Sequence, residues 1–427
     1  MQKKLNKLIK SKFVRNVTIM ATGTAGAQVI TLISSPVITR LYGPEAFGIM
    51  GTFSALINLI IPIAALTYPI AIVLPKKHRE AKDILNLSLI VTGILALLSL
   101  LIIITFNENI INLFNLEEIA VYLYLLPFVV ISSGVMQVAN QWLIRTRQFS
   151  INARVTFWES IITNGGKVVF GFLKPLAAFL VFFTSIRNGI RAAMMIFFAD
   201  KTEYKRSLKD DSQSIKTVAK KYRDFPLYRA PESFISAVSG GLPVLMLTSF
   251  FGPAAAGFYS IGRTVLSLPS QLIGKAVGDV FYPRITEAAH NNENIARIIK
   301  KATLGLSLIG VLPYGLVILF GPELFGLVFG SDWVIAGEYA RWISLWTFTS
   351  FINRPAVHSL AVLNAQKFHL LYTIIMLVTR LVLLSIGFYV FSSDLLAVSL
   401  FSISGAILNV GLILITLKMS EKRSISN

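Results

Sequence analysis

The chain carries one hexapeptide pattern twice, as Gly43-Pro44-Glu45-Ala46-Phe47-Gly48 and as Gly252-Pro253-Ala254-Ala255-Ala256-Gly257. The two copies are 209 residues apart, about half of the 427-residue chain. Each copy lies between two long apolar stretches. A sequence that repeats itself at half its length predicts two similar halves, an arrangement that is common in membrane transporters.

The flanks of the two copies also correspond. Residues 74–76 (Leu-Pro-Lys) match residues 282–284 (Tyr-Pro-Arg), and the order of apolar runs and basic loops is the same in both halves. We therefore expect a parallel internal repeat. A third look-alike, residues 321–326, has no matching flanks and belongs to no repeat.

The composition predicts a polytopic, all-α membrane protein. Hydrophobic residues make up 54% of the chain, charged residues only 14%, and the mean hydropathy is +0.68. A soluble domain usually carries about 25% charged residues. There is no cysteine, which excludes disulfides and thiolate chemistry. The first apolar run lacks a small-residue cleavage site, so we expect a retained helix rather than a signal peptide.

Apolar runs of membrane-spanning length predict about twelve transmembrane helices in two six-helix lobes. The spans are expected near 17–39, 47–74, 84–106, 118–143, 153–173, 176–199, 226–250, 257–282, 300–320, 334–362, 368–391 and 394–417. The expected organisation is an N-lobe over 1–199, a cytoplasmic linker over 200–225 and a C-lobe over 226–427.

The net charge of +19 suggests nucleic acid as a partner, but the placement of the charges argues against it. Nearly all Lys and Arg outside the spans fall on the two termini and on alternate loops, while the opposite side holds only Arg40 and Lys174. Positive charge marks the cytoplasmic side of a membrane protein and meets anionic lipid headgroups. We therefore expect a bacterial cytoplasmic membrane protein with both termini in the cytoplasm, and no nucleic acid.

The longest polar segment, 201–223, is the expected linker. Ile215, Val218, Ala219 and Tyr222 recur at helical spacing and predict a short amphipathic helix. A solvated helix at the membrane surface and a docking element for a partner protein both remain open.

Ionisable residues inside the predicted spans are the strongest functional signal. Each costs about 2.5–3.5 kcal/mol at the bilayer centre on insertion scales, so such residues indicate functional sites. The bases are Lys167, Arg187, Arg191, Arg229, Arg263, Lys275, Arg341, Arg354 and Arg380, and the acids are Glu159, Glu232, Asp279 and Glu338. The basic excess predicts a cationic, water-filled central cavity between the lobes that receives an anionic cargo. Snorkelling to the membrane surface remains an alternative for Arg229, Arg263 and Arg341.

Two further groups of candidates follow from the same spans. In the tenth span Trp342, Trp346, Ser350 and Asn353 are candidates for contact with a sugar, against an alternative of interface aromatics and interhelical hydrogen bonds. Candidates for carrying a coupling proton or sodium ion are Glu159, Glu232 and Asp279. Their alternative role is a salt bridge to neighbouring Lys or Arg.

Several chemistries lack their motifs. Residues 165–168 (Gly-Gly-Lys-Val) do not have the spacing or the hydroxyl of a Walker A loop, so ATP hydrolysis by that route is excluded. The four histidines are scattered, and we expect no metal and no cofactor. The short outer loops offer no convergent catalytic pair, which makes a secondary transporter more plausible than an enzyme.

The octapeptide Leu-Tyr-Gly-Pro-Glu-Ala-Phe-Gly at 41–48 and Phe-Gly-Pro-Ala-Ala-Ala-Gly at 251–257 resemble Wzx-type polysaccharide and O-antigen unit flippases. These belong to the polysaccharide transport branch of the multidrug/oligosaccharidyl-lipid/polysaccharide exporter superfamily, and the resemblance covers essentially the whole chain. It implies two helical bundles that alternate between inward-open and outward-open states. The implied cargo is an oligosaccharide on undecaprenyl pyrophosphate, as used for lipopolysaccharide or capsule, with a polysaccharide polymerase as a possible partner. A cation-coupled multidrug exporter of the same superfamily remains the main alternative, and a membrane glycosyltransferase or polymerase a weaker one.

Overall fold

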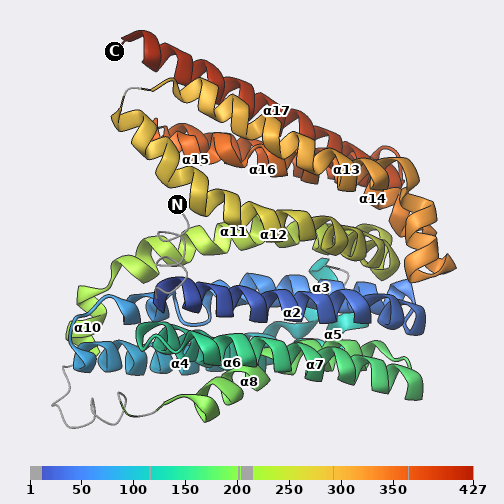
Figure 1. Ribbon diagram of the computed structural model, residues 1–427. Helices are drawn as coiled ribbons and strands as arrows, with labels where there is room; N and C mark the ends of the chain where they lie inside the picture. Colours follow the sequence, from blue (N-terminus) through green and yellow to red (C-terminus); the bar gives the residue numbers. More distant parts are fainter. Residues whose placement is uncertain are drawn as a thin grey trace. The chain divides into compact units, whose positions relative to one another are not determined.

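The computed structural model is built entirely from helices over the part of the chain that it describes, so the all-α class is confirmed. The described residues are 12–114, 117–200, 202, 215–291, 293–363 and 365–426; within them the side chains of 12–21, 113–114, 272–280, 282–283, 290, 361 and 422–426 are left undescribed. Each predicted span overlaps one of the long helices (Figure 1).

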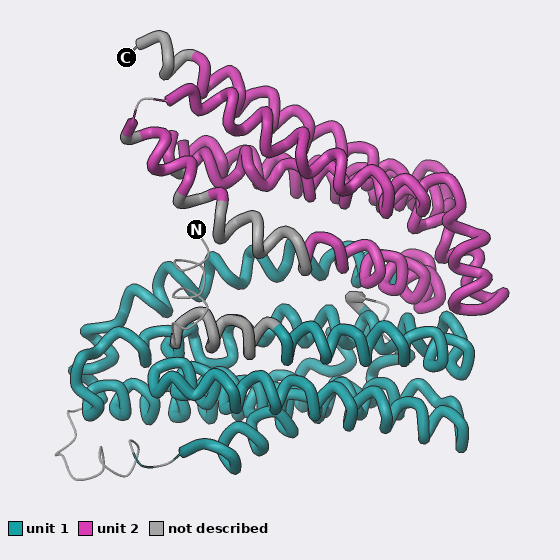
Figure 2. The backbone as a smooth tube through the Cα atoms, viewed as in Figure 1, with its two compact units in different colours: residues 1–249 teal, residues 250–427 magenta. Residues whose placement is uncertain are grey.

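The chain divides into two compact units, Met1–Ser249 and Phe250–Asn427 (Figure 2). Unit 1 contains α2 (Lys12–Leu41), α3 (Pro44–Ile60), α4 (His78–Phe114), α5 (Ala120–Leu123), α6 (Leu126–Arg145), α7 (Phe149–Leu173), α8 (Ala177–Phe198), α10 (Ile215–Lys221) and most of α11 (Ala230–Phe251). Unit 2 contains α12 (Pro253–His290), α13 (Ile295–Phe329), α14 (Val334–Ile352), α15 (Arg354–Val362), α16 (Gln366–Tyr389) and α17 (Asp394–Ser426). The predicted lobes at 1–199 and 226–427 differ from these units mainly in the assignment of α11. The internal repeat stays a prediction.

Seven helical segments in the described part are long and apolar enough to cross a membrane, or eight if the bent pair formed by Glu117–Leu123 and Leu126–Arg145 is one span. The count of twelve crossings therefore stays a prediction. The long helices that do not meet this test are α2, α7, α12 and α14. In unit 1 α2 packs on α7, and in unit 2 α14 packs on α13, α17 and α12.

Both repeated Gly-Pro turns begin a helix. Pro44 and Pro253 are the first residues of α3 and α12, where a missing N–H costs no hydrogen bond. Gly252 has a φ of 83°, a left-handed value that favours glycine. The third look-alike has a different role, because Pro322 lies inside α13.

The second predicted span is interrupted in unit 1. Beyond α3 the chain forms two 3-10 helices, Ile61–Ile63 and Tyr68–Val73, and between them Leu66 and Thr67 have φ values of 47° and 56°. Backbone groups released by such a break at membrane depth need partners from the protein. The Ile61 carbonyl accepts from the Ala64 N–H (3.3 Å) and from the Gln137 side chain (2.8 Å). The Thr67 hydroxyl ties the break to the segment before α11 by donating to the Phe225 carbonyl (3.0 Å).

The short helix predicted in the linker is present as α10. Val218 is buried in the same cluster as Tyr68 and Ile72 of unit 1. The Tyr222 hydroxyl donates to Glu80 (2.9 Å), and Lys221 forms an ion pair with the same carboxylate. The hydrogen bond from Lys221 to Glu80 raises the pKa of the Lys221 ammonium above its ordinary value. The helix is therefore docked on unit 1; residues 201 and 203–214 of the predicted linker lie outside the described residues.

In unit 2, α13 and α14 cross at two glycines. A Cβ added to Gly321 would come within 2.6 Å of the Gly337 carbonyl oxygen, so only glycine permits this approach. The neighbouring Pro322 has no N–H to donate to the Ile318 carbonyl four residues earlier. Arg341 replaces it, because its Nε donates to the Ile318 oxygen at 2.9 Å.

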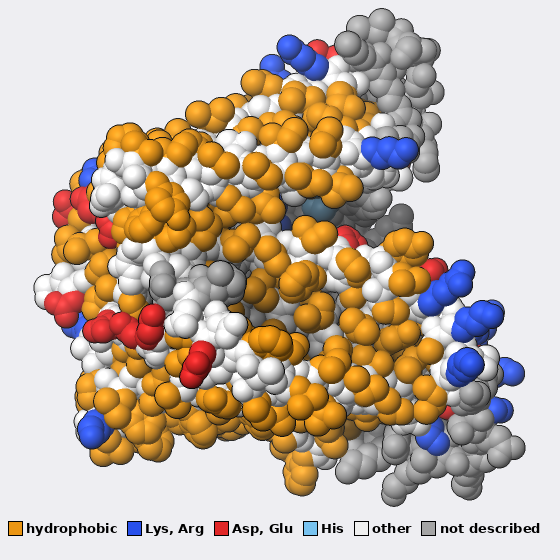
Figure 3. Space-filling model, turned by 180° about the vertical axis from the view of Figure 1, so that it is seen from behind, with side chains coloured by type: hydrophobic (Ala, Val, Ile, Leu, Met, Phe, Trp, Pro, Cys, Tyr) orange, Lys and Arg blue, Asp and Glu red, His pale blue; other side chains and the backbone are white. Residues whose placement is uncertain are grey.

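The surface carries a broad hydrophobic band. Figure 3 shows hydrophobic side chains over most of the visible face, and in unit 1 Lys and Arg gather toward one end of the helices while Asp and Glu gather toward the other. A broad apolar band with charge sorted to its two ends is the pattern of a multi-pass membrane protein.

We expect the substitution Arg341→Met to lower the free energy of unfolding by about 1–3 kcal/mol, because it leaves the Ile318 carbonyl without a partner. Adding Pro322→Ala restores the backbone N–H and should recover most of that loss. Denaturant unfolding of the purified proteins in detergent micelles measures the free energy of unfolding of the wild type, the single variant and the double variant. Glu338→Gln is the matched control, since it removes only the half-exposed ion pair with Arg341 (3.3 Å) and should cost less than about 1 kcal/mol. If Pro322→Ala brings no recovery, the carbonyl has another partner.

Candidate functional site

A cluster of charges lies inside unit 1 on two neighbouring helices. Glu159, Thr163 and Lys167 follow one another at four-residue steps on α7, and Arg187 and Arg191 do so on α8. We call Glu159, Lys167, Arg187 and Arg191 the cationic cluster. Residues four apart share a face of a helix, and α7 packs on α8.

Glu159 is the acid of the cationic cluster and is completely buried. Its Oε1 accepts hydrogen bonds from Arg187 Nε (2.8 Å) and from the Thr163 hydroxyl (3.2 Å). Its Oε2 is also buried and has no hydrogen-bond partner among the described residues. The carboxylate is therefore held through one oxygen only.

Arg187 lies at the middle of α8, roughly 15 Å from either end at 1.5 Å per residue. Its side chain is 57% exposed even though its Nε is bound to Glu159. An exposed guanidinium at that depth is far too costly against lipid hydrocarbon. This cost makes Arg187 a candidate for contact with water or an anion.

The other two cations have only neutral partners. Arg191 Nη2 donates to the Thr156 hydroxyl (3.1 Å) and to Asn152 Oδ1 (3.3 Å). The Lys167 ammonium has, among the described residues, one contact at hydrogen-bond range, the sulfur of Met50 at 3.6 Å. With three cations and one carboxylate, the described cluster has a surplus of two positive charges.

Arg380 of unit 2 lies in a different environment. Its Cζ is 4.0 Å from the ring centre of Trp346 on α14 and 3.9 Å from that of Phe401 on α17. The residue is 9% exposed. Each cation–π contact of a desolvated arginine contributes about 2 kcal/mol, which offsets part of the cost of burial. The ring of Trp346, a predicted sugar contact, is already covered by this guanidinium.

The remaining predicted bases are dispersed. Arg354 is half-buried at the junction of α14 and α15, within electrostatic range of Tyr314 and His358. Arg229 pairs with Glu232 at 2.9 Å near the start of α11, with both side chains more than half exposed. Arg263 is half-buried on α12. The side chains of Lys275 and Asp279 lie outside the described residues.

Among the other sugar candidates, Asn353 is buried and its amide donates to Asn409 Oδ1 on α17 at 3.0 Å, a contact between helices. Trp342 is half-buried and Ser350 is exposed.

Sequence reasoning missed Asn152 and Thr156, the neutral partners of Arg191. Both continue the polar stripe of Glu159, Thr163 and Lys167 along α7, and that periodicity would have identified them.

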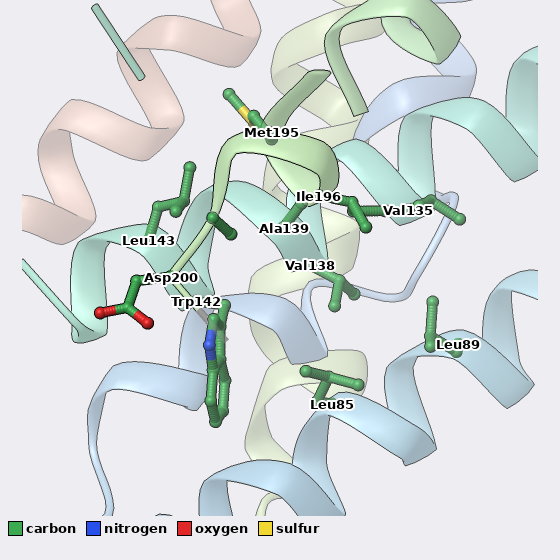
Figure 4. Close-up of a pocket in the computed structure, with 11 residues that line it drawn as sticks. Leu85, Leu89, Val135, Val138, Ala139, Trp142, Leu143, Met195, Ile196 and Asp200 are labelled. Carbon is green, nitrogen blue, oxygen red and sulfur yellow. The ribbon is translucent and has the colours of Figure 1, made fainter. Parts of the chain in front are cut away.

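Unit 1 also contains an apolar pocket of about 380 Å³. Figure 4 shows Leu85 and Leu89 of α4 on one side, Met195 and Ile196 of α8 on the other, and α6 between them. Asp200 is the only charged residue in its lining. The pocket therefore offers surface to hydrocarbon and almost nothing that recognises a charged or sugar head group.

Comparison with known proteins gives the family. The profile of the family described as "Polysaccharide biosynthesis protein" matches residues 37–337. The succinoglycan biosynthesis transport protein ExoT of Rhizobium meliloti (strain 1021) is 23% identical over 324 residues, which cover 74% of this chain and 61% of that protein. The chain thus spans 61% of the length of this curated relative.

Solved structures give the fold. A multidrug resistance MATE family transporter of the MOP superfamily in an inward-facing conformation has a TM-score of 0.72 at 16% identity and covers 96% of this chain and 99% of its own. The lipid II flippase MurJ in an inward closed conformation has a TM-score of 0.71 at 15% identity, covering 94% and 87%. A MOP superfamily transporter from Pyrococcus furiosus has a TM-score of 0.58 at 15% identity, covering 97% and 95%.

These long apolar helices define a polytopic membrane protein with the fold of the MATE and MurJ proteins. The chain belongs to the polysaccharide biosynthesis protein family, which confirms the resemblance drawn from the sequence.

We expect Glu159→Gln to lower the free energy of unfolding by about 1–3 kcal/mol. Removing the acid of a buried ion pair costs about 3–5 kcal/mol, and the exposure of Arg187 reduces that figure. The double variant Glu159→Gln/Arg187→Met should be less destabilised than the sum of the two single changes. Unfolding in detergent micelles measures all three variants. A Glu159→Gln protein as stable as the wild type would mean that the carboxyl group carries no charge at this position.

Proposed function

We propose that this membrane protein is a transporter, and specifically a lipid-linked oligosaccharide flippase. Its cargo is a polysaccharide repeat unit on undecaprenyl pyrophosphate, moved from the inner to the outer leaflet by alternating access. The observation that carries the proposal is the cationic cluster, with two surplus positive charges and the guanidinium of Arg187 open at the middle of a helix.

The chemistry of the cluster suits a pyrophosphate. A guanidinium donates paired hydrogen bonds to phosphate oxygens. Within the described part of the chain, Arg187 uses only its Nε, in the bond to Glu159. Membership of a polysaccharide family supports a saccharide cargo, and the likeness to a protein named a lipid II flippase supports a lipid carrier. The two lines agree on a lipid-linked, anionic saccharide.

The other candidates have secondary places in the proposal. Arg354 and Arg263 are secondary candidates for binding the same head group, and Lys275 stays a candidate from the sequence. Arg229 and Arg341 are weaker ones, because each already pairs with a carboxylate. Trp342 and Ser350 remain the better placed sugar contacts, since Trp346 and Asn353 are engaged within unit 2.

Glu159 is the best placed of the ion-coupling candidates, ahead of Glu232 and Asp279. An anion at Arg187 competes with the Glu159 carboxylate for the same guanidinium. Binding of an anion at Arg187 and release of Glu159 from Arg187 are therefore coupled, and the coupling is reciprocal.

The proposed location is the bacterial cytoplasmic membrane with both termini in the cytoplasm, in keeping with the sorting of basic residues. A polysaccharide polymerase on the outer side would use the delivered unit.

A multidrug exporter is the competing function, favoured by the likeness to MATE transporters. The sign of the cluster opposes it, because two surplus positive charges repel a cationic drug.

The test replaces Arg187 and Arg191 separately by Gln in a host that depends on this chain for its surface polysaccharide. We expect each change to reduce the polymer at least tenfold, since a charge-assisted hydrogen bond contributes about 1.5–3 kcal/mol, while the protein still reaches the membrane. Flipping of a short-chain polyprenyl-pyrophosphate oligosaccharide in proteoliposomes measures the same loss directly.

Arg284→Gln is the matched control, because Arg284 pairs with Glu293 (2.6 Å) at the end of α12 and should leave polymer normal. Normal polymer from both cluster variants would overturn the proposal. Extrusion of a cationic dye by energised vesicles would favour the exporter instead.

A further inference from the structure

Arg380 is a buried cation that has aromatic contacts but no polar partner. It forms no ion pair and its Nε no hydrogen bond among the described side chains, although nine-tenths of the residue is buried. The approach depends on Gly405 of α17, because a Cβ there would lie 3.2 Å from Arg380 Nε and 2.8 Å from Trp346. The interior of unit 2 is thus shaped to admit the guanidinium, yet leaves a donor unused.

Two hydroxyl groups of the same region are also without partners. Tyr259 of α12 is fully buried, and its ring meets the Phe401 ring that covers Arg380, with ring centres 6.4 Å apart. Its hydroxyl has no hydrogen bond within the described part of unit 2.

Ser402, next to Phe401 and three residues before Gly405, is fully buried and likewise unbonded in the described structure. This is unusual within α17, where Ser399, Ser404 and Ser420 each donate to a carbonyl of their own helix.

The electrostatics point in the same direction. The positive charge of Arg263 on α12 acts repulsively on Arg380. Among the described residues no carboxylate is paired with Arg380, and the hydroxyl groups of Tyr259 and Ser402 have no hydrogen bond. Buried polar groups in folded proteins are almost always satisfied, and a site made of donors and cations is satisfied by an anion.

We propose that unit 2 binds a small monovalent inorganic anion, such as chloride, between Arg380, Tyr259 and Ser402. The enclosure limits its size, since Tyr259 and Ser402 are fully buried and Arg380 nearly so. A sugar pyrophosphate does not fit this description, so the site is distinct from the cationic cluster of unit 1. The anion joins α12, α16 and α17 and completes the packing of the unit. This inference does not rest on the proposed cargo.

The test is thermal unfolding of the purified full-length protein in detergent micelles, with sodium chloride or bromide exchanged for sodium gluconate at constant ionic strength. We expect Tm of the wild type to rise saturably with either halide. Arg380→Met keeps the length of the side chain and should abolish that dependence. Tyr259→Phe removes only the hydroxyl and should raise the half-saturating chloride concentration about tenfold, the loss of one hydrogen bond to a charged group.

Arg341→Met is the control, because it removes another arginine of unit 2 that donates to a backbone carbonyl; it should lower Tm but keep the halide dependence. If Arg380→Met does not fold, Tyr259→Phe and Ser402→Ala carry the test. A wild-type Tm that is indifferent to halide would overturn the proposal in favour of a bound water. An equal halide effect in every variant would overturn it as a general salt effect.

Discussion

The bilayer interior supplies neither water nor counter-ions, and this constraint governs where each polar group of the chain lies. A carbonyl or a charge at that depth must find its partner within the protein. Arg341 donates to the carbonyl that Pro322 leaves unbonded, and Gln137 donates to the Ile61 carbonyl at the break in the second span. In water a solvent molecule could bond to these carbonyls, whereas here specific side chains donate to them.

The same constraint separates the arginines into different roles. Arg341 donates to a backbone carbonyl, Arg380 is stacked between two rings, and Arg191 is held by neutral side chains. Arg187 is different, because its charge is open at mid-helix. A count of basic residues in spans therefore overstates the charge available to a cargo. The surplus that matters is the part that neither packing nor backbone hydrogen bonding already uses.

The sequence predicted the helical class and the family well, because both depend on composition and on turns such as 43–48 that are readable locally. The short helix at 215–221 was likewise expected from the spacing of Val218 and Tyr222. The roles of Arg341 and Arg380 were not predictable, since they depend on which helices cross. No local pattern says that Pro322 faces α14, or that Gly405 leaves room for a guanidinium from α16.

The predicted repeat relates the turns and spans of the two halves, but it does not relate their charged residues. The two halves can be aligned at the 219-residue spacing between Phe149 and Phe368. At that spacing the four members of the cationic cluster align with Val378, Ile386, Ala406 and Val410, all apolar. An alignment at the 209-residue spacing of the Gly-Pro turns also places only apolar residues opposite the cluster. In the predicted repeat, the cationic cluster therefore has no charged counterpart at the matching positions of the second half. A cargo with one anionic head needs one such site, and a second copy in the other half would compete for the same head group and slow its release. The proposed cargo has one anionic head group, and one such cluster suffices to bind it.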